Sequence, residues 1–178
     1  MSSQTTSNPP SDSGVYLFAL ELARSRTLTV GALGSIRFER GWYVYVGSAR
    51  RGLARRLARH ERRRNGKRLR WHIDFLRVAA RATRAFPLHT WLDLECRLAQ
   101  DTKRISDGEV LGFGCSDCAC QSHLFRFPRD PLKDARFLAL VRRYRHEYCD
   151  GSSGRLVVRG QDGRRVAPAV DVGRAWAR

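Results

Sequence analysis

The stretch GWYVYVGSARRGLARRLARH, residues 41–60, changes character within a few positions. Residues 41–47 are aromatic and β-branched and are bounded by glycines, which is typical of a strand. From residue 50 onward the chain is crowded with arginine, and its leucines recur at helical spacing. The sequence therefore predicts a strand whose closing glycine, Gly47, allows a close turn into a basic helix over residues 50–64.

This predicted helix carries two kinds of arginine. On a wheel of about 100° per residue that starts at Leu53, His60 lies about 20° and Arg56 about 60° from the apolar reference. Arg55 and Arg59 fall on the opposite side of the wheel. We therefore expect Arg56 to be held against the body of the protein, and the outer arginines to be solvated or to follow a phosphate backbone.

The remaining elements can be placed outward from this junction. Strands are expected at 15–22, 27–33, 36–38, 83–90 (interrupted by Pro87) and 123–127, and further helices at 71–82, 91–104 and 135–148. In the helix 91–104, Trp91, Leu94 and Leu98 form the expected inner stripe, with Glu95 at its margin. This order of elements indicates an α+β domain whose small, mostly antiparallel sheet is flanked by helices.

Length and composition predict one domain with tails. Residues 1–13 are mainly Ser, Thr, Pro and Asn and are expected to be disordered, residues 14–150 to form the domain, and residues 151–178, rich in Gly and Arg, to be a basic, flexible tail. The longest apolar runs are too short for a membrane span, and residues 1–13 lack the hydrophobic stretch of a secretory signal. The five cysteines, three of them within residues 115–120, do not resemble a disulfide framework and favour a reducing cytoplasm.

The charge predicts a polyanionic partner. Lys and Arg number 34 against 17 acidic residues, a formal net charge of +17. The basic residues are mostly Arg, which binds phosphate bidentately, so nucleic acid is favoured, although composition does not separate DNA from RNA or a membrane surface. Eleven basic residues lie within 50–70, where Glu61 is the only acid. The expected phosphate contacts are Arg50, Arg51, Arg55, Arg59, Arg63, Lys67 and Arg68.

Several motifs in order resemble a known family. The blocks GVYLFALEL, GWYVYVGSARRGLARRLARH, WHIDFL, ECRLA and GFGCSDCACQSHLF span residues 14–127 and are similar to the GIY-YIG nuclease superfamily. Within it they resemble the uncharacterised branch whose members occur alone or fused to endonuclease III-type repair glycosylases. The resemblance implies a three-stranded, mostly antiparallel GIY-YIG-like sheet. The distance from Tyr16 to Tyr45 is long for the superfamily and implies a hairpin-like insertion between the motif strands.

The resemblance also implies roles for individual residues. The tyrosine matching Tyr16 helps to activate the attacking water, and the one matching Tyr45 orients the nucleophile or the phosphate. The residue matching Arg56 stabilises the charge of the transition state, and the one matching His60 assists proton transfer. The glutamate matching Glu95 binds one Mg²⁺ or Mn²⁺, for which a hard oxygen ligand with retained waters is suited.

Two further motifs leave alternatives open. In WHID, His72 is a further catalytic candidate that can approach the phosphate, whereas Asp74 can cap the helix or pair with an arginine; the alternative is a helix start with local hydrogen bonds. Many relatives carry a late Asn in the site, and here only Asn8 and Asn65 occur, both badly placed.

The cysteine loop CSDCACQSH is the second of these motifs. It offers four soft ligands for Zn²⁺: Cys115, Cys118, Cys120 and His123. One tight loop rarely reaches all four corners of a tetrahedron, so a structural turn is favoured over zinc, unless Cys96 substitutes for one ligand. A third alternative is that the loop lines the catalytic cleft and supplies the missing polar group.

Taken together, the sequence predicts a metal-dependent endonuclease that hydrolyses DNA phosphodiester bonds, in repair or in the processing of branched or damaged structures. The first alternative is a nucleic-acid-binding module whose catalytic site has lapsed. The second is an RNA- or ribosome-associated basic protein. A nuclease needs a base, a cation at the phosphate and a metal-binding carboxylate, and these are the groups that the motifs supply.

Overall fold

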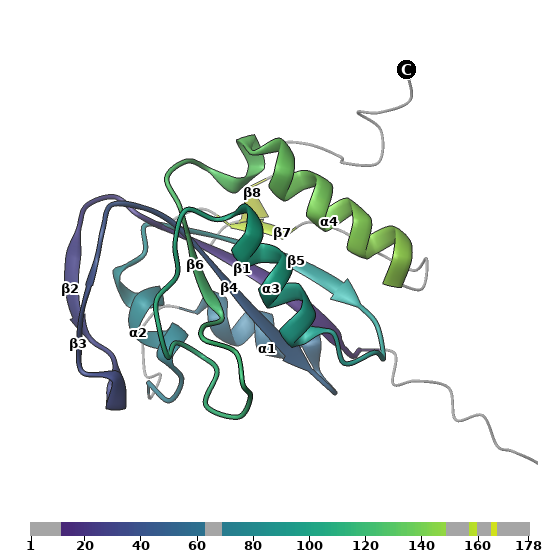
Figure 1. Ribbon diagram of the computed structural model, residues 1–178, viewed down its shortest axis with the longest axis horizontal. Coiled ribbons are helices and arrows are strands. Elements are labelled where there is room, and N and C mark those ends of the chain that lie inside the picture. Colours follow the sequence, from purple (N-terminus) through teal and green to yellow (C-terminus); the bar gives the residue numbers. More distant parts are fainter. Residues whose placement is uncertain (1–11, 63–68, 149–156, 160–164, 167–178) are drawn as a thin grey trace, which may run out of the picture.

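The computed structural model describes residues 12–62, 69–148, 157–159 and 165–166 of the chain. These residues form an α+β fold with one main antiparallel sheet in the order β6-β4-β1-β5-β7-β8 (Figure 1). Its strands are β1 (Gly14–Leu22), β4 (Gly41–Ala49), β5 (Ala82–His89), β6 (Leu124–Phe127), β7 (Val157–Arg159) and β8 (Arg165–Val166). The α+β class is confirmed. The sheet has six strands in the described residues instead of the expected three, because β6 adds to one edge and β7 and β8 add to the other.

Helices cover both faces of this sheet. They are α1 (Leu53–Glu61), α2 (His72–Ala79), α3 (Glu95–Ile105) and α4 (Ala135–Tyr148). Side chains alternate along the two central strands: Tyr16 and Phe18 face the core shared with α1 and α2, whereas Val15 and Leu17 face the core shared with α3 and α4. Strand β1 is buried on both faces, which explains why its sequence is a continuous apolar run rather than an alternating one.

The insertion predicted between the motif strands is confirmed. Strands β2 (Arg26–Thr29) and β3 (Ser35–Phe38) form a separate antiparallel pair that leaves the main sheet after β1 and returns to β4 (Figure 1). The expected strand 27–33 is shorter than predicted, because the chain turns through a short 3₁₀ helix, Gly31–Leu33, between β2 and β3. Val30 and Phe38 anchor the hairpin in the core beside α2.

Several predicted boundaries are wrong. The helix expected over 50–64 spans Leu53–Glu61, and the helix expected over 91–104 begins only at Glu95. The helix expected over 71–82 ends at Ala79, because Ala80 is extended and Ala82 already pairs with Glu21 of β1. Strand β5 then runs through Pro87 without interruption. Its outer neighbour β7 pairs with Thr83–Ala85, so within the described residues the missing amide hydrogen of Pro87 removes no bond on that side.

The ends of the domain also differ from prediction. Asp12 and Ser13, assigned to the disordered segment, contact the domain: Asp12 accepts a hydrogen bond from the amide of Ala54 in the first turn of α1, and the Ser13 hydroxyl donates to the carbonyl of Thr90. Residues 1–11 lie outside the described residues. Of the predicted tail 151–178, the described part is β7 and β8, which extend the sheet instead of forming a tail.

Candidate functional site

Two tyrosines from adjacent strands form the centre of the candidate site. Tyr16 of β1 lies directly opposite Gly47 of β4, and its ring centroid lies 6.2 Å from that of Tyr45. A Cβ at position 47 would overlap the ring and hydroxyl of Tyr16. Gly47 therefore makes room for this ring and does not form the expected turn, which occurs at Gly52, where the backbone is left-handed (φ 70°).

Helix α1 supplies a histidine to the tyrosine pair. The Tyr16 hydroxyl and Nε2 of His60 lie 2.8 Å apart, and His60 is buried at 1% exposure. The imidazole centroid is also 6.2 Å from that of Tyr45. Burial raises the pKa of both phenols, with further contributions from nearby acidic groups, so both stay protonated at neutral pH. Tyr16 and His60 thus form a buried pair through which a proton can be exchanged.

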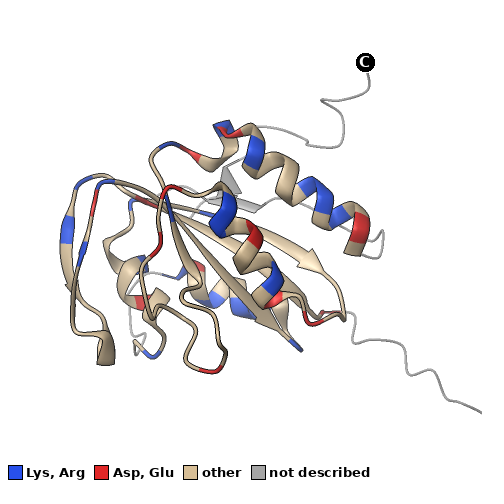
Figure 2. Ribbon diagram, viewed as in Figure 1, with Lys and Arg blue, Asp and Glu red and all other residues tan. Residues whose placement is uncertain are grey.

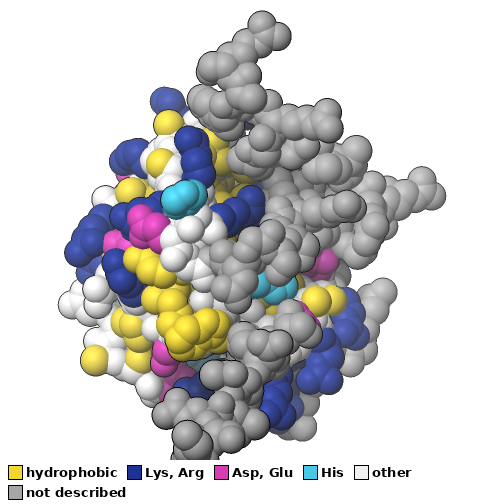
Figure 3. Space-filling model, turned by 90° about the vertical axis from the view of Figure 1, so that its right-hand side faces the viewer, with side chains coloured by type: hydrophobic (Ala, Val, Ile, Leu, Met, Phe, Trp, Pro, Cys, Tyr) yellow, Lys and Arg dark blue, Asp and Glu magenta, His cyan; other side chains and the backbone are white. Residues whose placement is uncertain are grey.

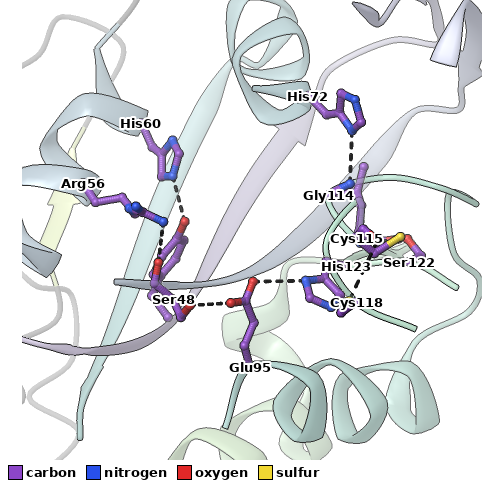
Figure 4. Close-up of polar contacts among 12 residues, drawn as sticks. Ser48, Arg56, His60, His72, Glu95, Gly114, Cys115, Cys118, Ser122 and His123 are labelled. Atoms are coloured by element: carbon purple, nitrogen blue, oxygen red, sulfur yellow. Dashed lines mark hydrogen bonds and ion pairs between the residues drawn. The ribbon is translucent and has the colours of Figure 1, made fainter. Parts of the chain in front are cut away.

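One helical turn before His60, Arg56 lies at the margin of this site. Its guanidinium Nη1 donates to the carbonyl of Ser48 over 2.5 Å and lies 5.1 Å from the ring centre of Trp71. Arg56 is half-buried, whereas Arg55 is exposed. The helical wheel therefore placed Arg56 correctly, but Arg59, which it assigned to the outer face, is also half-buried. Figure 4 shows Arg56 and His60 on the same side of the site.

Glu95, the first residue of α3, closes the site from the other face of the sheet. Its carboxylate accepts hydrogen bonds from the Ser48 hydroxyl and from Nδ1 of His123, the latter over 3.2 Å (Figure 4). Burial alone would raise the pKa of this carboxyl, but the hydrogen bonds from His123 and Ser48 and the nearby charge of Arg56 outweigh it and lower the pKa. Glu95 is therefore an ionised carboxylate with a side chain that is 25% exposed.

Ser48 is the residue that the sequence analysis missed. Its hydroxyl donates to Glu95 while its backbone carbonyl accepts from Arg56, so one residue at the end of β4 contacts both charged groups. Alternation along β4 could have indicated it: Tyr45 and Gly47 face α1, so Ser48 faces α3.

Arg59 is not available as a phosphate contact in the way that was predicted. Its guanidinium forms two 3.0 Å hydrogen bonds with the buried carboxylate of Asp74 and lies 4.1 Å from the ring centre of Trp71. Asp74 also accepts from the backbone amides of Arg70 and Trp71, which holds the start of α2. Both roles suggested for Asp74, a cap and an arginine partner, are therefore confirmed.

The other predicted phosphate contacts are exposed or not described. Arg50, Arg51 and Arg55 are exposed near the start of α1, and Arg63, Lys67 and Arg68 lie outside the described residues. Positive charge is not restricted to this helix. Figure 2 shows Lys and Arg on α3, α4 and the β2–β3 hairpin as well, and Figure 3 shows them at the upper left and the lower right of one face.

His72 lies against the loop that joins α3 to β6. Its Nδ1 accepts a hydrogen bond from the amide of Gly114 over 3.1 Å, and its ring packs on Phe113. Burial lowers the pKa of His72, so the ring is neutral at neutral pH. The same loop approaches Tyr45, since a Cβ at Gly114 would lie 2.6 Å from the Tyr45 ring. These contacts fit the third alternative for the cysteine loop, in which the loop lines the site.

The cysteines of this loop gather around His123. Cys118 and Cys120 approach it together with Cys96, in the first turn of α3, and the four ligand atoms lie within 4.8 Å of one another. Cys115, which the sequence analysis included in the set, is replaced by Cys96. The chemistry of this set, three thiols and one imidazole, is that of a zinc site.

Comparison with known proteins identified a family without an assigned activity. The model of one family, described as "Domain of unknown function DUF123", matches residues 15–145. Searches of curated proteins and of solved structures found no match. Within the described residues, no helix combines the length and apolar character needed to span a bilayer.

Proposed function

The chain belongs to the DUF123 family, and from that premise we propose that it is a metal-dependent endonuclease that hydrolyses DNA phosphodiester bonds by GIY-YIG-type chemistry. One observation carries the proposal. Tyr16, Tyr45, Arg56, His60 and Glu95 come from two strands and two helices and are joined by contacts into one site. These are the residues that the resemblance to that superfamily had selected from the sequence.

The Tyr16–His60 pair supplies the proton transfer. A tyrosine with a raised pKa stays protonated and is not a base by itself, but its hydroxyl can take a proton from an attacking water while its own proton passes to Nε2 of His60. The 2.8 Å separation is within the range for such a transfer. Tyr45, beside this pair, positions the water or a phosphate oxygen.

Arg56 and Glu95 supply the charges. The guanidinium of Arg56 retains donors beyond the one used by Ser48, and these are suited to the charge that develops on the phosphate. Glu95 fits the metal that the family implies, because it is an ionised, partly exposed oxygen ligand whose position is fixed by Ser48 and His123. A bound Mg²⁺ or Mn²⁺ would neutralise phosphate charge at Glu95.

One observation favours a second function, a nucleic-acid-binding module without catalysis. Both oxygens of the Glu95 carboxylate already accept hydrogen bonds within the protein, and Arg56 already binds a backbone carbonyl. Such internal contacts can hold a site together after its chemistry has been lost.

Cleavage assays separate the two functions. Supercoiled and flapped DNA are incubated with Mg²⁺ or Mn²⁺ and the wild type, Glu95→Gln, Arg56→Ala or the control Arg24→Ala, which changes an exposed arginine between β1 and β2. We expect the first two variants to lose about 10²-fold or more in cleavage with DNA binding retained, and the exposed-arginine control to keep its turnover. Binding without cleavage by all four proteins would support the module. A preference for structured RNA would support the RNA- or ribosome-associated alternative.

A further inference from the structure

Apart from the Glu95 site, the structure holds a second cluster of metal-ligating side chains. Cys96, Cys118, Cys120 and His123 bring three thiol sulfurs and one imidazole nitrogen within 4.8 Å of one another. We propose that these four residues bind one structural Zn²⁺ ion that fixes the α3–β6 loop and, through His123, the position of Glu95. The zinc site stands on its own geometry, and only the consequence for Glu95 rests on the proposed nuclease.

The spacing of the ligand atoms is that of a tetrahedral site. Zn–S bonds of about 2.3 Å and Zn–N bonds of about 2.0–2.1 Å at tetrahedral angles separate a sulfur from a nitrogen ligand by about 3.6 Å. The sulfur of Cys118 lies 3.6 Å from Nε2 of His123. Two sulfur ligands of such a site lie about 3.8 Å apart. The four ligand atoms already lie within 4.8 Å of one another, so the side chains need to move only slightly to bind the ion.

The ligands come from two elements, as most structural zinc sites require. Cys96 is in the first turn of α3, whereas the other three belong to the end of the loop that leads into β6. This arrangement removes the objection that one tight loop cannot wrap a tetrahedron. Cys115 has a different role: its backbone carbonyl accepts from the amide of Cys118 and shapes the turn.

His123 has the surroundings of a zinc-binding histidine. It is buried at 2% exposure, and its two ring nitrogens face different groups: Nδ1 faces the carboxylate of Glu95, and Nε2 faces the sulfur of Cys118. A proton on Nδ1, donated to Glu95, leaves the Nε2 lone pair for a metal, as in carboxylate–histidine–zinc arrangements. Metal binding at Nε2 would thus fix the histidine that holds Glu95.

The donor set distinguishes this ion from the one at Glu95. Thiolate and imidazole ligands select Zn²⁺, whereas Mg²⁺ takes oxygen ligands. Four protein ligands close the coordination sphere, which is typical of structural rather than catalytic zinc. The predicted role of this zinc is therefore to order the loop.

The test measures zinc in the full chain, purified without a metal-affinity column, by elemental analysis. We expect about one zinc per chain in the wild type and in Cys115→Ser, and loss of zinc in Cys96→Ser and His123→Ala. Should Cys96→Ser fail to fold, Cys96→His keeps a ligand and is expected to retain one equivalent. Co²⁺ substitution gives a second readout, since the thiolate-to-cobalt absorption of Cys96→His should be weaker than that of the wild type.

Several results would overturn the site. One is a reduced wild-type protein that binds no zinc when zinc is supplied. Another is a wild-type mass lower by two hydrogens, which would show a disulfide. The third is zinc lost in Cys115→Ser and retained in Cys96→Ser. Glu95→Gln separates the proposals, because it should retain zinc whether or not the wild type cleaves DNA. Zinc binding without cleavage by the wild type would leave the zinc site standing and refute the nuclease.

Discussion

Replacing Gly47 by alanine tests the packing at the centre of the site. Gly47 has ordinary strand geometry, so an alanine strains no backbone angle, and the effect is confined to the added methyl group. That methyl would overlap the hydroxyl and Cζ of Tyr16 and lie 3.0 Å from its Cε1. Tyr16 is 1% exposed and bonded to His60, so its ring has little room to move.

The expected cost can be worked from three terms. Overpacking a dense core costs about 1–3 kcal/mol, and losing the Tyr16–His60 hydrogen bond costs about 0.5–1.5 kcal/mol. A glycine-to-alanine change that suits the backbone returns about 0.4–1 kcal/mol through the unfolded chain. The net loss in free energy of unfolding is about 0.5–4 kcal/mol. With a urea m-value of about 2 kcal/mol/M, a loss of about 2 kcal/mol lowers the urea midpoint by about 1 M.

The assay is urea unfolding of Gly47→Ala in three backgrounds. Tyr16→Leu removes all three atoms that the methyl would meet, whereas Tyr16→Phe removes only the hydroxyl. The cost of Gly47→Ala should disappear in the leucine background, or become a gain of up to about 1 kcal/mol, and should largely persist in the phenylalanine background. An equal cost in the wild-type and leucine backgrounds would refute the reasoning, because the loss would then lie in the strand itself.

Four further outcomes are expected. Asp74→Asn should lower the free energy of unfolding by about 2–4 kcal/mol in urea titrations, since it removes the charge that faces Arg59 in a buried position; an unchanged midpoint would contradict this. Arg59→Ala should lower the urea midpoint, whereas Arg55→Ala should weaken DNA binding and its salt dependence without changing that midpoint. Weaker DNA binding with an unchanged midpoint in Arg59→Ala would instead support Arg59 as a phosphate contact. Ser48→Ala should raise the Mg²⁺ concentration for half-maximal cleavage about tenfold by releasing Glu95, and an unchanged Mg²⁺ dependence would contradict that link. The absorbance of tyrosinate should stay low at about pH 10, where free tyrosine is half ionised, and should rise together with alkaline unfolding. The reason is that a raised tyrosine pKa stabilises the folded state below the unfolded pKa, and this stability is lost as the pH rises through the folded pKa. Early, gradual ionisation of more than one tyrosine would refute this expectation, which applies to Tyr16, Tyr43, Tyr45 and Tyr144, whose pKa is raised first by burial, and not to Tyr148.

The sequence predicted those parts of the fold that depend on local pattern. Strands β1 and β4, helix α4 and the inward side of α1 follow from residues close together in the chain. Prediction failed where contacts with residues distant in the sequence determine where an element begins. Strand β5 begins at Ala82 because it pairs with β1, although the helical spacing continues through that position. Trp91 is 65% exposed because α3 starts only at Glu95, so the wheel drawn from Trp91 does not apply to it.

The site was predictable to a different extent. Tyr16, Arg56 and Glu95 occupy recognisable positions in the sequence motifs. Once the register of β1 and β4 is known, strand pairing predicts which residues lie beside Tyr16. The Arg59–Asp74 pair and the entry of Cys96 into the cysteine cluster depend on how α1, α2 and α3 pack on the sheet. No spacing within a single motif encodes such contacts, so the sequence could name Cys96 only as a possible substitute.

Ser48 explains how residues on opposite faces of one sheet can act together. Tyr16, Tyr45 and His60 belong to the face covered by α1 and α2, whereas Glu95 comes from α3 on the other face. A sheet normally separates such groups by its own thickness. At the end of β4, however, the Ser48 side chain points to Glu95 while its carbonyl lies in reach of Arg56. The end of β4 therefore links the two faces, and in the proposed nuclease it is where one phosphate would meet both Glu95 and Arg56.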